Sequence, residues 1–205
     1  MTDTQQLIRA VTEADSPARM VAAVQKLAFS KDVAAIPTLI TVFGYNNPGA
    51  AIAAVTGLVE LGDVAVPQLL EQIDEYNYGA RAYSIRTLAA IGDPRAIDVL
   101  LVAAATDFAP SVRRAAAKGL GNLHWHKLDA AERLKAQTKA METLLSISLD
   151  SDWSIRYAAT VGLQGLVKIP DLQSPIQSRF KEILEADAEK VVRARVQLAQ
   201  GVVSS

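Results

Sequence analysis

Cysteine is absent from this 205-residue sequence, and histidine occurs only twice. Without a thiol, the chain forms no disulfide, offers no thiolate ligand to a metal and holds no nucleophilic sulfur of its own. The two histidines form a His124-x-His126 pair, and two imidazoles alone are too few to complete a zinc site, so we predict no native metal. A cysteine-free chain is compatible with a reducing compartment, and we expect a cytoplasmic protein.

A strong excess of either charge is also missing. The chain carries 21 basic and 22 acidic residues, and this balance argues against a protein whose task is to neutralise a phosphate backbone. Hydrophobic residues make up 50% of the sequence, but their runs are shorter than the roughly 20 apolar residues of a membrane helix. Residues 1–8 lack the basic and then apolar pattern of a secretory signal. We therefore predict no nucleic-acid partner and no integral membrane segment.

Aromatic residues are scarce, at 5%, whereas small and aliphatic residues are plentiful. Small aliphatic side chains let helix axes approach closely, as in proteins built from repeated helix pairs. A leucine marks each successive amphipathic segment, at intervals of 31, 30, 32, 43 and 35 residues: Leu27, Leu58, Leu88, Leu120, Leu163 and, more loosely, Leu198. This period predicts an all-α fold, a right-handed α-solenoid of HEAT- or armadillo-like helix pairs with about five to six repeats.

Capping signals set the expected helix boundaries. Ser16-Pro17 and Asn47-Pro48 each place a capping side chain before a proline at the first helical position. We expect a single domain over residues 1–205, with a capping helix near 4–14. Inner helices are expected near 17–29, 48–61, 79–91, 110–122, 152–166 and 189–202, and outer helices near 33–43, 65–75, 94–105, 129–149 and 173–186. The two long leucine intervals predict insertions near 124–135 and 168–175, and such insertions collect along one edge of a solenoid.

Three arginines each lie seven residues before a marker leucine, and an aspartate precedes each of them by six or seven residues. They are Arg81, Arg113 and Arg156, with Asp74, Asp107 and Asp150. We expect the arginines to stack on successive inner helices. One interpretation is a ladder of structural ion pairs between adjacent repeats. The other is a row of guanidinium groups on a concave face, suited to bidentate capture of carboxylates.

Aromatic side chains cluster near these arginines, and two of them stand at the starts of predicted inner helices: Tyr76, Tyr78, Tyr83, Trp153 and Tyr157. They either pack against neighbouring loops or form a ridge on which a flat, extended ligand stacks. In the first insertion, His124 and Trp125 belong to a loop suited to contact with a partner. An imidazole that titrates near neutral pH can also transfer a proton.

No catalytic motif is found in the sequence. It has no glycine-rich phosphate loop, no nucleophile elbow and no pair of metal-binding carboxylates at helical spacing. Judged by its residues alone, the chain is interpreted as a non-enzymatic binding scaffold.

Two stretches resemble the E/F-type phycobilin lyases of cyanobacteria and red algae, above all their smaller, beta-type subunits that act on α-phycocyanin. They are YNYGARAYSIRTLAAIGDPRAIDVLLVAAATDFAPSVRRAAAKGLGNLHW, residues 76–125, and DSDWSIRYAATVGLQGL, residues 150–166. The specific parts are YNYGARAYSIRTL, GNLHW and DWSIRYAATVGLQGL, because GDxxAxxxLL and VRxxAAxxL occur in HEAT repeats generally. The resemblance covers most of the chain, including the first insertion.

The resemblance implies an enzyme subunit that is active as a heterodimer with a second HEAT-repeat subunit, the alpha subunit. Together they bind phycocyanobilin and attach it through a thioether to one cysteine of apo-α-phycocyanin, so the sulfur belongs to the acceptor. The chain would have no cofactor of its own, phycocyanobilin being the substrate, and would serve phycobilisome assembly. The alternative is a non-enzymatic HEAT-repeat adaptor or chaperone that binds phycobiliproteins during phycobilisome assembly or degradation.

The same resemblance assigns roles to residues of this chain. Arginines would bind the two propionates, aromatic rings would stack on the tetrapyrrole, and a carboxylate would favour the protonated pyrrole nitrogens. The bilin-binding candidates are Tyr76, Tyr78, Arg81, Arg86, Arg113, Trp125, Trp153, Arg156 and Tyr157. The catalytic candidates are Asp107, Asp150, Asp152 and His124, with either His124 or a group of the partner subunit as the proton acceptor for the thiol. Catalysis would consist mainly of orienting one ring carbon toward the sulfur.

Overall fold

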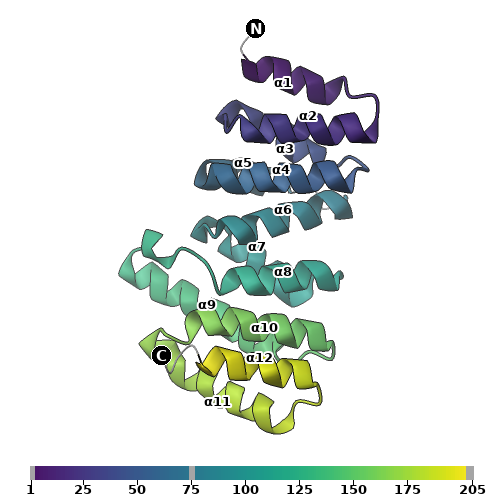
Figure 1. Ribbon diagram of the computed structural model, residues 1–205. Helices are drawn as coiled ribbons and strands as arrows, with labels where there is room; N and C mark the ends of the chain where they lie inside the picture. Colours follow the sequence, from purple (N-terminus) through teal and green to yellow (C-terminus); the bar gives the residue numbers. More distant parts are fainter. Residues whose placement is uncertain (1–2, 74–76, 202–205) are drawn as a thin grey trace. The chain divides into compact units, whose positions relative to one another are not determined.

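The structure, a computed structural model, describes residues 3–73 and 77–201. The chain divides into two compact units, Met1–Ile91 and Gly92–Ser205. Throughout the described residues the regular secondary structure is α-helical or 3-10 helical, without a strand (Figure 1). The predicted all-α fold of stacked helix pairs is confirmed, and the single domain over residues 1–205 stays a prediction.

The first unit contains two layers of helices. Its elements are α1 (Asp3–Thr12), α2 (Pro17–Phe29), α3 (Ile36–Val42), α4 (Pro48–Leu61), α5 (Val66–Glu71) and α6 (Tyr78–Ile91). Helices α2, α4 and α6 lie side by side in one layer, α3 and α5 pack behind them, and α1 packs on α2 (Figure 1). The marker residues Leu27, Leu58 and Leu88 are fully buried, so the repeated leucine forms the core between the layers.

The second unit repeats this arrangement. Its elements are α7 (Ile97–Thr106), α8 (Pro110–Leu120), α9 (Ala130–Ile147), α10 (Trp153–Leu166), α11 (Pro170–Ala186) and α12 (Lys190–Gly201). Helices α8, α10 and α12 form one layer, and α7, α9 and α11 form the other. Leu120 and Leu163 are fully buried, but Leu198 is 62% exposed, and Val196 and Ala199 fill the core in its place. The assignment of Leu198 as a marker was therefore wrong, because the register of α12 turns that side chain outward.

Polar side chains begin the helices where the sequence predicts. At five α-helix starts among the described residues, a side-chain oxygen accepts a hydrogen bond from a backbone N–H of the first turn: Ser16, Asn47, Asn77, Asp129 and Asp152. These bonds satisfy donors that have no partner inside the helix. The boundaries of α2 and α4 accordingly coincide with the predicted ranges 17–29 and 48–61.

The outer helices differ in detail from the prediction. Each of the first three begins with a 3-10 turn: η1 (Val33–Ala35), η2 (Gly62–Ala65) and η3 (Pro94–Ala96). The predicted insertion near 124–135 contains the 3-10 turn η4 (Trp125–Lys127) and the start of α9. The predicted insertion near 168–175 is mostly helical, since α11 begins at Pro170, where a missing N–H costs nothing, and continues through Pro175.

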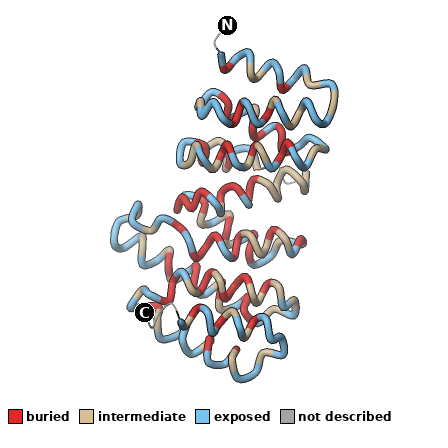
Figure 2. Tube along the Cα trace, viewed as in Figure 1, coloured by how far each residue is buried: buried red, intermediate tan, exposed pale blue. Residues whose placement is uncertain are grey.

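One stretch, Pro48–Glu71, is long and apolar enough to cross a membrane by composition, with a hydropathy of 1.6. In the folded chain this stretch is two helices, because the backbone turns at Gly62, whose φ of 70° is a left-handed conformation that glycine adopts readily. Buried residues such as Ala54 and Leu69 follow the sides of α4 and α5 that face the core (Figure 2). Core packing of a helix pair accounts for the hydrophobicity of this stretch.

Glycines set the close approach of α8 and α10 in the second unit. A methyl group at Gly165 would overlap the backbone carbonyl of Gly121, and one at Gly162 would overlap the carbonyl of Ala117. Neither obstacle is a flexible side chain, so the helices would have to move apart.

Substituting Gly165→Ala is therefore expected to destabilise the chain by about 2 kcal/mol, as overpacking of a close helix crossing does. Urea unfolding followed by circular dichroism measures this loss. The matched control is Gly201→Ala, where an added methyl group meets no atom within 4 Å. Equal unfolding midpoints for the two variants would contradict the proposed contact between α8 and α10.

Candidate functional site

Two of the predicted arginines are engaged in ion pairs in the second unit. Nη2 of Arg113, on α8, lies 2.7 Å from Oδ2 of Asp150, in the connection before α10. Nε and Nη2 of Arg156, on α10, donate to the two carboxylate oxygens of Asp187 at 2.8 and 2.9 Å. We call these four residues the arginine–aspartate network. The bidentate geometry at Arg156 is the strong form of this interaction.

Backbone carbonyls complete the coordination of both guanidinium groups. Nη1 of Arg156 donates to the carbonyls of Asp150 and Ser151 at 2.9 and 3.1 Å. Nε of Arg113 donates to the carbonyl of Ala104 at 3.1 Å. The network thus ties each loop to the helix of the preceding repeat. This geometry favours the structural interpretation of Arg113 and Arg156, and their role in bilin binding stays a prediction.

The two pairs join adjacent repeats, as the ladder interpretation expected. Arg113 pairs with the aspartate 37 residues after it and Arg156 with the one 31 residues after it. Asp187 was not among the aspartates singled out from the sequence, although it stands before an inner helix as Asp150 does. The Arg156 guanidinium lowers the pKa of the Asp187 carboxyl, mainly through their hydrogen bond.

The three aspartates predicted to be catalytic all accept backbone hydrogen bonds at the starts of inner helices. Asp107 accepts from the N–H of Ala109 at 2.8 Å, and Asp150 from the N–H of Asp152 at 2.8 Å. Asp152 accepts from the N–H of Ser154 at 2.7 Å, and hydrogen bonds with Ser154 hold its pKa below the ordinary value. Their observed contacts are those of turn and cap residues, and catalytic roles for them stay predictions.

In the first unit, the candidates lie along α6. Tyr78 begins this helix and is 40% exposed, and Arg81 is half-buried one turn later. Asp74 and Tyr76 lie outside the described residues. Arg86 is exposed, its guanidinium carbon lies 5.8 Å from the centre of the Tyr83 ring, and no acidic side chain among the described residues pairs with it.

The Tyr83 ring belongs to an aromatic pocket that the sequence reasoning did not foresee. Tyr83 stacks on Phe43, with ring centres 5.6 Å apart and planes inclined by 29°. A pocket of about 330 Å³ opens beside this pair, lined by Phe43, Gly44, Tyr45, Asn46, Asn47, Pro48, Asn77, Gly79 and Tyr83. Phe43 and Tyr45 were missed because they follow an outer helix. The Tyr45-Asn-Asn-Pro turn before α4 was the available signal.

The inserted loop of the second unit is held to η3 by polar contacts. The backbone N–H of His124 donates to the carbonyl of Gly92 at 2.7 Å. Nζ of Lys127 lies 3.5 Å from Oδ2 of Asp93, which also pairs with Arg95 at 2.9 Å. The hydrogen bond from Arg95 is the main cause that lowers the pKa of Asp93 to about 2.

The imidazoles of this loop stay accessible. His124 and His126 are exposed, with ring centres 5.8 Å apart, while Trp125 is half-buried between them. On α10, Trp153 is 47% exposed and Tyr157 half-buried, four residues apart and therefore on one face of the helix. Within each unit, then, the structure gathers the candidates into separate groups: the α6 aromatic pocket in the first, and the network, the inserted loop and the α10 face in the second.

Comparisons with known proteins identify the family. A family model described as HEAT repeats matches residues 66–164. The chain is 73% identical over 197 residues, covering 96% of this chain and 98% of the relative, to a protein of Nostoc sp. (strain PCC 7120) named phycocyanobilin lyase subunit beta. The chain belongs to the phycocyanobilin lyase subunit beta family. The resemblance carried by YNYGARAYSIRTL and DWSIRYAATVGLQGL is confirmed.

Two further relatives support the same family of lyase subunits. The phycocyanin alpha phycocyanobilin lyase CpcF of Synechocystis sp. (strain PCC 6803) is 47% identical, over 94% of this chain and 90% of the relative. A solved structure, that of the complex of CpcE and CpcF of phycocyanin lyase from Nostoc sp. PCC7120, matches at 76% identity and a TM-score of 0.79, over 82% of this chain and 99% of that chain. As a member of this family, the chain has the length and fold of a beta-type lyase subunit.

Removing Arg156 from the network tests its structural role. Arg156→Ala leaves the carboxylate of Asp187, 4% exposed, without its partner. We expect a loss of about 3 kcal/mol in the free energy of unfolding, as for a broken buried pair. Urea unfolding measures it, with Arg9→Ala as the control, because Arg9 forms an exposed pair with Glu13 and its loss should change little. Equal stability of the two variants would contradict the structural interpretation.

Acid titration tests the anchor of the inserted loop. Because the pKa of Asp93 is about 2 when folded and near 3.8 when unfolded, the unfolded state binds more protons between these values. The stabilisation by Asp93 is complete above about pH 4 and disappears as the pH falls through 2. Asp93→Asn should lower stability at pH 7 and flatten its dependence on pH between 4 and 2, as measured by thermal unfolding across that range. An unchanged profile would show that the Asp93 ion pairs contribute nothing.

Proposed function

We propose that this chain is one subunit of a heterodimeric lyase that attaches phycocyanobilin through a thioether to a cysteine of the α-phycocyanin subunit. The observation that carries the proposal is the 73% identity to a phycocyanobilin lyase subunit beta over nearly the full length of both chains. The partner that we infer is a second HEAT-repeat subunit, and the solved complex of CpcE and CpcF of phycocyanin lyase supports a heterodimer. The site of action is cytoplasmic, in phycobilisome maturation, the role named for a relative that is 46% identical.

The absence of cysteine from the chain fits this chemistry. The thiol of the acceptor protein adds across the ethylidene double bond of ring A, forming one carbon–sulfur bond while the thiol proton is returned to the tetrapyrrole. The addition is neutral in electrons, so no redox cofactor takes part. The subunits have to hold one carbon of the bilin and one face of it toward the incoming sulfur, which is catalysis by orientation. Phycocyanobilin is the substrate, and the chain needs no cofactor of its own.

Within this chain, the α6 aromatic pocket, together with Tyr78 and Arg86, supplies the surface for the bilin. The rings of Tyr78 and Tyr83, which are partly exposed, present aromatic faces for a conjugated tetrapyrrole, and the buried ring of Phe43 stacks on Tyr83. Arg86, exposed and without a carboxylate partner among the described residues, is available for a propionate. Arg113 and Arg156 are held in the network, and we assign them to the stability of the second unit. Arg81 and Tyr76 remain candidates for the bilin site.

The second unit offers groups for proton transfer and stacking. His124 is exposed in the inserted loop and is suited to accept the proton of the thiol. Trp125, Trp153 and Tyr157 provide further rings for the bilin or for the partner subunit. Asp107, Asp150 and Asp152 act as cap and turn residues, and as carboxylates they stay candidates to favour the protonated pyrrole nitrogens of the bilin.

Production of the chain together with the alpha subunit, a source of phycocyanobilin and apo-α-phycocyanin tests the function. A covalent adduct on the α subunit, seen as zinc-dependent fluorescence on a denaturing gel and absent when either lyase subunit is omitted, is the expected result. Full turnover by the purified chain alone would overturn the heterodimer. Faster loss of already attached pigment, without attachment, would identify the alternative, an adaptor in degradation.

The role of Arg86 is tested in the same assay. Arg86→Ala removes one charge-assisted hydrogen bond to a propionate, so we expect the KM for phycocyanobilin to rise about tenfold. Arg86 is exposed, and its loss should leave the helical circular dichroism unchanged. Arg19→Ala is the control, since Arg19 is another exposed arginine of the first unit. An unchanged KM for the bilin in Arg86→Ala would remove this residue from the binding site.

A further inference from the structure

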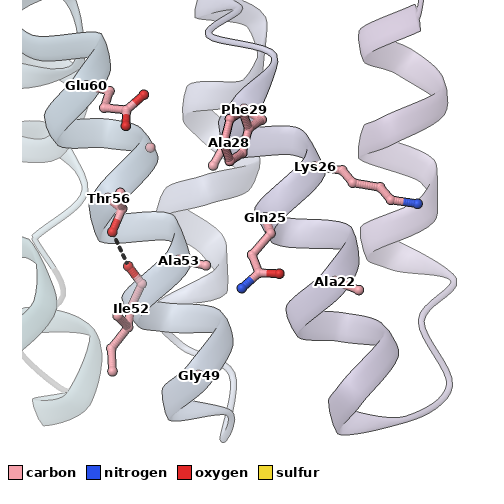
Figure 3. Close-up of a pocket in the computed structure, with 11 residues that line it drawn as sticks. Ala22, Gln25, Lys26, Ala28, Phe29, Gly49, Ile52, Ala53, Thr56 and Glu60 are labelled. Carbon is pink, nitrogen blue, oxygen red and sulfur yellow. Dashed lines mark hydrogen bonds between the residues drawn. The ribbon is translucent and has the colours of Figure 1, made fainter.

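A groove of about 640 Å³ lies on the exposed surface of the first unit between α2 and α4 (Figure 3). Its floor is made of small buried residues, Ala28 and Gly57. The two helices approach so closely that a methyl group on Gly57 would overlap Ala28. Because both helices belong to one layer, the groove runs along them, with the side chain of Gln25 extending between them (Figure 3).

Two large apolar side chains of this groove face solvent. Phe29, at the end of α2, is 84% exposed, and Ile52, on α4, is 56% exposed (Figure 3). Neither contributes to the core of the unit, so folding of this chain does not explain them. Exposed apolar side chains beside a groove of small residues are typical of a surface that binds a protein.

The charges of the groove are uneven. Glu60, on the α4 side, is 3.2 Å from Lys31 and is therefore neutralised. Lys26, on the α2 side, is exposed, and no acidic side chain among the described residues pairs with it. Its side chain extends from α2 away from Ile52 and Thr56 of α4, so the cationic edge of the groove lies on the outer side of α2 (Figure 3). The groove therefore complements a ligand that is apolar along its centre and acidic along one edge.

We propose that this groove receives an amphipathic helix of the acceptor protein, with an apolar stripe against Phe29 and Ile52 and an acidic residue at Lys26. The inference rests on the proposed function, which requires an acceptor protein to bind to the lyase. A helix fits because a third helix can place a ridge of residues i, i+4 and i+7 into the furrow between two parallel helices. The small floor allows the close approach that such packing needs.

The size of the surface argues for the acceptor and against the permanent partner subunit. The groove is lined by 11 residues, whereas stable interfaces use about 20 to 30 residues on each side. A product protein must leave after each turnover, and a small contact gives the fast dissociation that this requires. A single helix of a transiently bound acceptor therefore matches the dimensions of the groove, which by itself is smaller than a permanent interface.

The double variant Phe29→Ala with Ile52→Ala, in the purified heterodimer, tests the proposal. Both side chains are exposed, so the fold should be retained. We expect the KM for apo-α-phycocyanin to rise about tenfold while kcat changes less than about twofold, because only ground-state binding is removed. Lys26→Glu should raise the same KM and weaken its dependence on salt. The matched controls are Leu198→Ala, an exposed apolar residue of α12, and Lys139→Glu, an exposed lysine of α9.

Three other results would overturn the proposal, and each is distinct from a failure of the proposed function. An unchanged KM for the acceptor in both groove variants would show that the acceptor does not bind there. Loss of heterodimer in size-exclusion chromatography would assign the groove to the partner subunit. A raised KM for phycocyanobilin with the acceptor KM unchanged would assign it to the bilin. Failure of the proposed function itself would instead appear as no adduct with the unmodified heterodimer.

Discussion

The second unit depends on the coordination of two guanidinium groups at the places where one helix pair meets the next. In a stack of helix pairs, each pair contacts only its neighbours, so the contacts at each junction decide whether the stack holds. Hydrophobic burial of residues such as Leu120 and Leu163 presses the layers together but does not fix the loops. Arg113 and Arg156 fix them, because each donates both to a carboxylate and to backbone carbonyls of a neighbouring segment.

Because of this coordination, the guanidinium groups of Arg113 and Arg156 are already paired and are not free to bind an anionic ligand. A guanidinium group that already binds a carboxylate bidentately, as Arg156 does with Asp187, would have to break that pair before it could bind a propionate. Breaking a pair of which one member is nearly buried costs several kcal/mol. An anionic ligand therefore gains more from an exposed arginine whose charge is not compensated. In the first unit Arg86 meets this description, beside the ring of Tyr83.

The sequence predicted the helices well because their signals are local. The leucine period fixes the core positions, and caps such as Ser16 and Asn47 fix the starts of α2 and α4. The partner of each arginine was not predictable in the same way. The ladder interpretation placed the pairs between adjacent repeats but did not name the partners, and only the packing of α8 against α10 brings Asp150 to 2.7 Å from Arg113. The prediction for Leu198 was wrong for a related reason. The repeat interval before Leu198 is irregular and does not determine the rotation of α12 about its own axis.

The aromatic pocket beside Tyr83 shows why the candidate site could be predicted only in part from the sequence. Tyr83 was recognised as a candidate from its neighbours in the sequence, but the contact that gives it a pocket comes from Phe43, 40 residues earlier in the chain. Spacing along one repeat cannot find such a pair, because it is formed between the end of an outer helix and the middle of an inner one. The family of the chain indicates that the ligand is a bilin. Which residues of this chain can contact the bilin can be inferred only from the three-dimensional structure.

Because this lyase subunit has no thiol, the sulfur for the new bond has to come from the acceptor protein. In the proposed function the reactive sulfur and the reactive double bond both arrive with the substrates, so the role that we propose for the subunit is to position them and to help accept the thiol proton. Positioning the two substrates requires a rigid site that binds the bilin and a separate site that binds the acceptor protein more weakly. The bilin must stay oriented while the acceptor protein binds and dissociates. In the first unit, the α6 pocket with its stacked rings suits the first task, and the shallow α2–α4 groove with exposed Phe29 suits the second. A single surface that bound both ligands tightly would release its product slowly. Two separate surfaces, one that binds the bilin tightly and one that binds the acceptor protein weakly, avoid that conflict.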